Sequence, residues 1–143
     1  MSTLEYQAHA AVTSARLESD ILAGLAVALD ACGMPDVIVA EHLDALALIR
    51  QWAGRPMWEM NARDTDTYFT HHTRDWNYPT RLAHAQALAC YFTFLAGLAG
   101  QEILAVAGLE PARCPLDELN WPAPFLSGRS PLAAVPGQPA AED

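Results

Sequence analysis

The chain has 143 residues, a length suited to one domain with a single hydrophobic core. Seventeen acidic residues outnumber eight basic ones, none of them lysine, so the formal net charge is -9. This balance argues against a protein that holds nucleic acid by bulk electrostatic attraction. A hydrophobic content of 52% excludes a chain that is disordered throughout.

Membrane insertion and secretion are not indicated by the sequence. Asp30, Glu41, Asp44 and Arg50 interrupt the candidate apolar runs, so we expect none to reach the length of a membrane span. The first 15 residues carry Glu5 and no basic residue near the start, unlike a signal peptide. We therefore expect a cytoplasmic protein. Its three cysteines lie far apart without CxxC spacing, so neither a disulfide framework nor a zinc knuckle is predicted.

The N-terminal third predicts two helices. Ser2 or Thr3 can cap the first, which should run to about residue 31 and end at Gly33. Its apolar residues recur near a seven-residue rhythm, but Glu18 falls on that seam, which favours packing against the domain over an oligomerisation arm. The second helix, residues 37–53, should be capped by Asp36 and stopped by Gly54 in a left-handed conformation.

Three further elements are predicted. Residues 57–60 form a hydrophobic bridge, and a helix from 62 to 72 or 73 should begin at a capping box of Asn61 and Asp64. Pro79 and the capping residue Asn77 start the next helix, residues 80–95. A short segment, residues 101–107, is expected to be helical beyond a kink.

The helix over residues 80–95 is the predicted functional element. Its expected core face comprises Leu82, Ala85, Leu88, Ala89, Phe92 and Leu95, and its expected polar side comprises Thr80, Arg81, His84, Gln86 and Thr93. No acidic residue occurs from Pro79 to Gln101, so a polyanion would not be repelled there.

Composition divides the chain into residues 1–35, an N-terminal helix; 36–109, a helical domain; and 110–143, a tail with seven of the ten prolines. Such a tail cannot form a helix or a central strand, and we expect it to be a linker or a free tail with a disordered end, residues 135–143. The predicted fold is all-α, a small orthogonal bundle of four to five helices with an extra N-terminal helix.

Residues 41–95 resemble the core-binding, SAM-like domain of tyrosine recombinases, the phage integrase family. The resemblance is carried by three short patterns in order: Trp52, Gly54, Arg55 and Pro56; then Asp64, Asp66 and Tyr68; then Pro79, Thr80, Tyr91, Phe92, Phe94 and Leu95. The later segment CPLDELNWP, residues 114–122, is similar to the stretch that leads such domains towards their catalytic half.

The resemblance implies a DNA-binding module used in recombination or integration, with double-stranded DNA as partner. In that family the helix bearing Arg81 lies in the major groove, so Arg81 would contact a base or phosphate, assisted by Thr80 and His84. Arg50, Arg55 and Arg74 would hold phosphates. A recombinase catalytic subunit or a second copy are further possible partners.

No catalytic activity, metal or cofactor is predicted. The family's catalytic Tyr, Arg, His and Lys belong to a separate domain, and the chain has no lysine with which to assemble such a cluster. Tyr68, Tyr78 and Tyr91 are therefore interpreted as packing residues. His71 and His72 near Asp64 and Asp66 lack the spacing of a metal site. The alternative function is a helical protein-protein interaction module that has lost DNA affinity.

Overall fold

The computed structural model describes residues 3–110, 114–116 and 121–122, and the side chains from Ser14 onward within this set. This part of the chain contains five α-helices and no strand, so the predicted all-α bundle is confirmed. The expected disordered end, residues 135–143, and most of the Pro-rich tail lie outside the described residues.

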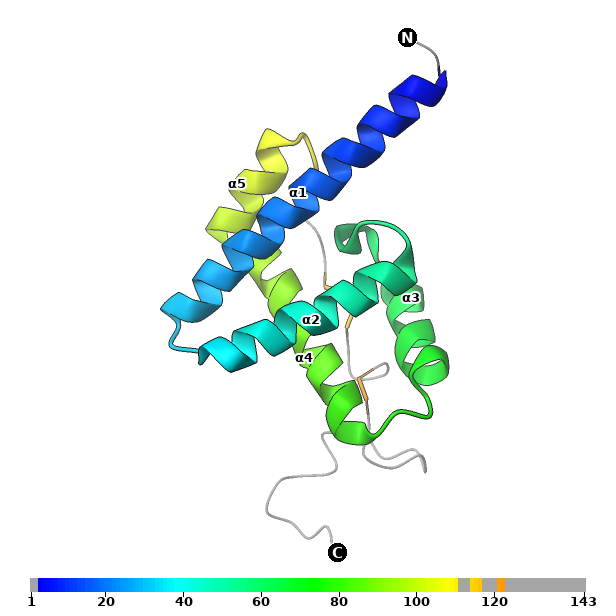
Figure 1. The fold of residues 1–143 in the computed structure, drawn as a ribbon, viewed down its shortest axis with the longest axis vertical. Coiled ribbons are helices and arrows are strands. Elements are labelled where there is room, and N and C mark those ends of the chain that lie inside the picture. Colours follow the sequence, from blue (N-terminus) through cyan, green and yellow to red (C-terminus); the bar gives the residue numbers. More distant parts are fainter. Residues whose placement is uncertain (1–2, 111–113, 117–120, 123–143) are drawn as a thin grey trace, which may run out of the picture.

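The first two helices form a V-shaped pair. α1, Thr3–Ala31, crosses the bundle and projects beyond it at its N-terminal end, and α2, Asp36–Ala53, returns beneath it (Figure 1). Gly33, with φ of 90°, makes the turn between them. Gly54 ends α2 at φ of 70°, confirming the predicted left-handed cap. The predicted cap at Asp36 is wrong, because the helix already includes Asp36 and Pro35 precedes it without a side-chain cap.

The middle of the chain differs from the prediction in helix type, since it contains a 3-10 turn and a π-helical turn. The bridge is a single 3-10 turn, Met57–Glu59, rather than irregular chain, and it buries Met57. α3, Ala62–Thr67, begins with the predicted capping box between Asn61 and Asp64. It then widens into a π-helical turn, Tyr68–His72, so the single helix expected to residue 72 changes type at Tyr68.

α4, Tyr78–Ala96, is the central helix and contacts α1, α2 and α5. The Asn77 side chain accepts a hydrogen bond from the Thr80 amide at 2.9 Å, which confirms the predicted cap. α5, Leu98–Val106, follows at an angle of 71° and lies against α1 (Figure 1). None of the described helices is by itself long and apolar enough to cross a membrane; α4 and α5 meet that test only as a bent pair.

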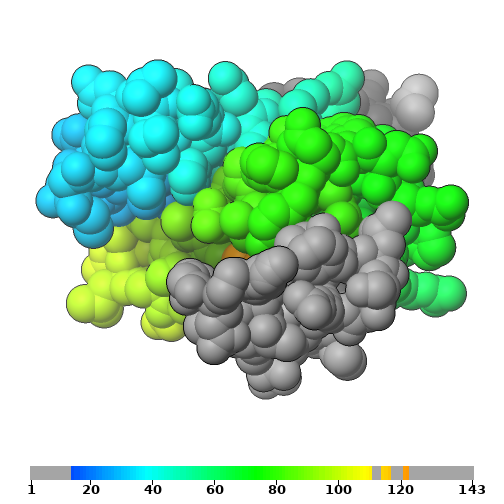
Figure 2. Space-filling view, turned by 90° about the horizontal axis from the view of Figure 1, so that it is seen from below, coloured from blue at the N-terminus to red at the C-terminus, as the bar shows by residue number. Residues whose placement is uncertain are grey.

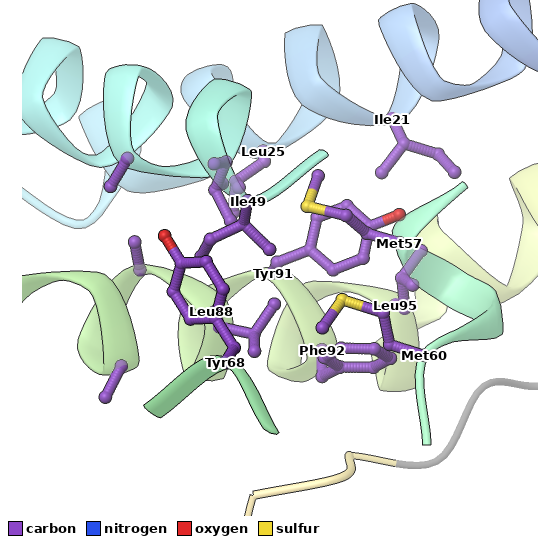
Figure 3. Close-up of a cluster of buried hydrophobic side chains, with 14 of the residues drawn as sticks. Ile21, Leu25, Ile49, Met57, Met60, Tyr68, Leu88, Tyr91, Phe92 and Leu95 are labelled. Atoms are coloured by element: carbon purple, nitrogen blue, oxygen red, sulfur yellow. The ribbon is translucent and has the colours of Figure 1, made fainter. Parts of the chain in front are cut away.

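The core lies where α1, α2 and α4 cross (Figure 3). Ile21 and Leu25 of α1 are fully buried there, so α1 belongs to the same core as the helices after it. Tyr68 and Tyr91 are also fully buried, which confirms them as packing residues. The remaining members of the cluster include Leu46, Ile49, Met57, Met60, Leu88, Phe92 and Leu95.

Candidate interaction surface

Arg81, the residue expected to meet DNA, points into the protein. Its side chain is only 8% exposed, and Nη2 donates a hydrogen bond to the carbonyl oxygen of Phe69 at 2.5 Å. That carbonyl belongs to the π-helical turn, whose last carbonyls have no partner within the helix. A cation is also favoured at the C-terminal end of a helix. The prediction of an outward-facing Arg81 is therefore wrong, and the guanidinium ties α4 to the π turn.

His84 is buried as well, at 5% exposure, so its predicted place on an outer face is wrong. Its Nδ1 lies 2.9 Å from the hydroxyl oxygen of Tyr68, and its ring meets Trp76 edge-on with centroids 5.1 Å apart. Burial lowers the pKa of His84, which favours the neutral ring. The ring thus joins an aromatic cluster with Trp52, Tyr68 and Trp76.

Arg81 and His84 lie on the core-facing side of α4, at three- and four-residue spacing from its apolar core residues. Arg81, His84, Ala85, Leu88, Phe92 and Leu95 follow one stripe of α4, and all are buried. Of the predicted core residues, Leu82 and Ala89 are instead half-buried. The stripe is visible in the sequence, but residue type alone predicts Arg and His at the surface. Because α4 is packed by three helices, little of its circumference remains for a polar side.

Two other predicted cations are engaged in ion pairs. Nε of Arg50 lies 2.8 Å from Oε1 of Glu18, and the Arg55 guanidinium pairs with Asp64. Thr80 and Arg74 are exposed, at the start of α4 and in the loop before it. The structure therefore does not bring the six predicted DNA-binding residues together on one face, and only Thr80 and Arg74 of the set are both exposed and outside an ion pair.

Glu18, which interrupts the apolar seam of α1 in the sequence, is the buried acceptor of a polar network in the structure. It is 4% exposed, accepts a hydrogen bond from the Tyr91 hydroxyl at 2.6 Å, and faces the Met57 amide at 3.2 and 3.3 Å. With Arg50, these contacts join α1, α2, the 3-10 turn and α4. Desolvation by burial raises the pKa of Glu18, although Tyr91, Met57 and Arg50 all act to lower it.

An open groove of about 450 Å³ lies between α1 and α5. In a view from below, α5 forms an edge of the molecule beside α1 (Figure 2). Two carboxylates and a set of apolar side chains line the groove: Asp20 and Glu102, with Leu17, Ala99, Ile103, Val106 and Ala107. Val106 is 91% exposed, and Leu98, two turns earlier on α5, is 83% exposed. Sequence reasoning missed this surface because it placed α5 at residues 101–107 and gave it no role.

In the part of the chain that the structure describes, no group of three or more His, Cys, Asp or Glu side chains is arranged to hold a metal ion. Comparison of the chain with protein-family models, with curated proteins and with solved structures finds no match. The resemblance to recombinase core-binding domains therefore stays a prediction.

Proposed function

We propose that the chain is a helical protein-interaction module that binds a partner through the apolar face of α5 and the adjoining surface of α1. The observation that carries this proposal is the exposure of two apolar side chains on α5, Leu98 and Val106, the second of which lines a groove with the half-buried Ile103. Single exposed apolar residues are ordinary on protein surfaces. Here Val106 and Ile103 line one groove together with Leu17 of α1.

Burial of these side chains would supply the binding free energy. Covering a Val or Leu side chain contributes about 1.5–3 kcal/mol when it is removed fully from water, before the costs of association are subtracted. α5 is short and exposes two such residues, so the interface is of the small, transient kind unless the partner reaches further over α1.

DNA binding is the second candidate function, and fewer residues are free to contact DNA than the sequence predicts. Arg81 and His84 are occupied inside the fold, while Arg74 and Thr80 remain exposed at one end of α4. A partner recombinase subunit would be needed to supply further cations, since the chain itself carries a net charge of -9.

A pair of cross-linking variants tests the interaction proposal. A photoreactive amino acid replaces Val106 in one variant and Val27 in a matched control. The Val27 side chain is 71% exposed but does not line the groove. We expect a discrete protein adduct from position 106 in the native cells and none from position 27. The captured protein, once purified, should bind the full chain, and replacement of Val106 by Ser should weaken that binding. Equal labelling at both positions would contradict the proposal.

Binding to duplex DNA tests the DNA-binding hypothesis. Retention of DNA that weakens linearly with salt on a logarithmic plot, and that falls when Arg74 is replaced by Ala, would favour nucleic-acid binding. An apolar protein interface should change little over the same salt range. Arg74 is the informative position, because replacing Arg81 would also disturb the π turn.

A further inference from the structure

We infer that the groove between α1 and α5 binds a short amphipathic helix whose apolar stripe is flanked by lysine or arginine. This inference rests on the proposed interaction function and names its partner class. The two walls of the groove are helices, and a third helix can lay its side-chain ridges between them. Its apolar residues would meet Leu17, Ile103 and Val106.

The charge of the groove selects the partner. Asp20 stands on the α1 wall and Glu102 on the α5 wall, and no Arg or His is among the described residues that line the space. Both carboxylates are exposed, so cationic side chains can approach them from solvent. Arg16 lies one turn before Asp20 on α1, outside the groove lining, and no ion pair within 4.0 Å joins the two in the described set.

The size of the groove limits the partner to a short contact. From Ala99 to Val106, α5 rises about 10 Å, which matches roughly two turns of a bound helix. Ala99 and Ala107 are small, so the backbone of a partner helix can come close at both ends. A two-turn contact with charged flanks fits three or four apolar residues at positions i, i+3, i+4 and i+7.

A second copy of this chain is a poorer occupant. Each copy would bring the same two carboxylates and a net charge of -9 to the contact, and like charges across an interface oppose association. A basic helix instead gains from the field of the whole chain, which speeds its approach.

Fluorescence anisotropy with three synthetic peptides tests the inference. Each peptide is a labelled helix of about 14 residues, or four turns, with leucine on one face. The first carries Lys on both flanks of the stripe, the second carries Glu there, and the third keeps Lys but replaces Leu by Ala. With the full chain at low salt, we expect the Lys-Leu peptide to bind at least about tenfold more tightly than either of the others.

Variants locate the binding site. Val106→Ser should weaken the Lys-Leu peptide by about tenfold or more, whereas Val27→Ser on an exposed position of α1 should leave it unchanged. Replacing both Asp20 and Glu102 by Lys should transfer the preference to the Glu-Leu peptide. All four positions are exposed, so circular dichroism is expected to show unaltered folding in each variant.

Several outcomes would overturn the inference. The first is equal binding of the Lys-Leu and Glu-Leu peptides, and the second is binding of the Lys-Leu peptide that Val106→Ser leaves unchanged. The third is concentration-dependent dimerisation of the chain that Val106→Ser abolishes. The fourth is displacement of the Lys-Leu peptide by a peptide of residues 123–143. If one of these occurs while position 106 still cross-links to a purified partner, the proposed interaction function stands and only the basic amphipathic helix is rejected as the partner. If position 106 labels no partner, the proposed function itself fails.

Discussion

Glu18 shows how one residue can hold several elements together. Its carboxylate accepts hydrogen bonds from the Tyr91 hydroxyl and the Met57 amide and forms an ion pair with the Arg50 guanidinium, so three donors depend on one acceptor. Deleting a buried acceptor leaves its donors unsatisfied, and each of these carries its own desolvation cost. Breaking a buried charged network is accordingly among the larger effects that a single substitution can have.

Glu18→Ala should therefore lower the free energy of unfolding by about 2–4 kcal/mol, measured by urea denaturation. Glu18→Gln retains a carbonyl oxygen for Tyr91 and Met57 and should cost much less. The pH dependence separates charge from hydrogen bonding. Since the pKa of Glu18 is raised above 4.5 in the folded protein, the unfolded chain releases this proton first as pH rises.

The stability of the wild type relative to Glu18→Gln should consequently fall as pH rises from below 4.5 through the raised pKa, and then level off. Other titrating groups are common to both proteins and cancel in the difference. A difference that grew over the same interval would mean that Arg50 and the two hydrogen bonds outweigh burial.

His84 makes the opposite prediction on acidification. Its pKa is lowered by burial, so the unfolded chain takes up the proton first when pH falls through 6.5. Stability relative to His84→Asn, which can keep a hydrogen bond to the Tyr68 hydroxyl, should therefore decrease as pH falls from above 6.5 to the lowered value. NMR of the His84 ring would report the same shift. A ring that titrates at the ordinary value would contradict its burial.

At the scale of elements, the bend between α4 and α5 depends on one glycine. A Cβ atom built on Gly100 would lie 2.2 Å from the Phe94 carbonyl oxygen and 2.5 Å from the Leu95 Cα, both backbone atoms that cannot move aside. The absence of a side chain there lets the first turn of α5 approach the last turn of α4. Gly97, at the bend itself, has φ of -81° and would place a Cβ at an acceptable 3.4 Å.

Gly100→Ala should destabilise the protein by about 3 kcal/mol or more, because the two helix ends must separate, whereas Gly97→Ala should change stability little. Thermal unfolding followed by circular dichroism compares the two. Equal effects of the two substitutions would show that the requirement is for flexibility at the bend rather than for space at Gly100.

Local signals allowed most element boundaries to be predicted. Asn61 with Asp64, Asn77 before Pro79, and Gly54 act within a few residues of chain, so their structural effects are visible in the sequence. The π turn at Tyr68 was not predictable in this way, since it depends on the packing of Tyr68 and Phe69 in the core.

The candidate site was predicted less well than the fold. Whether Arg81 faces solvent depends on which helices surround α4 and on a free carbonyl at Phe69, twelve residues earlier in the chain. The groove depends on α5 folding back beside α1, an arrangement set by the bend at Gly97 and by the close approach at Gly100.

For the whole molecule, two sets of contacts hold α1 to the later helices: the polar network of Glu18 and the apolar core. Ile21 and Leu25 pack into the core on the face of α1 that also carries Glu18. The C-terminal half of α1 should therefore open only when α4 does, as one cooperative unit. In contrast, the N-terminal end of α1 projects past the bundle in Figure 1, where helical hydrogen bonds have less tertiary support.

Native-state hydrogen exchange tests this connection directly. In the wild type, amides of residues 21–29 should exchange with the same free energy of opening as those of α4 around Leu88, while amides near Thr3 should exchange much faster. In Glu18→Ala, the two groups should separate, with residues 21–29 opening at lower free energy, because the link from α1 to Arg50, Met57 and Tyr91 is lost. If both groups fell together by the same amount, packing of Ile21 and Leu25 alone would suffice to couple α1 to the bundle.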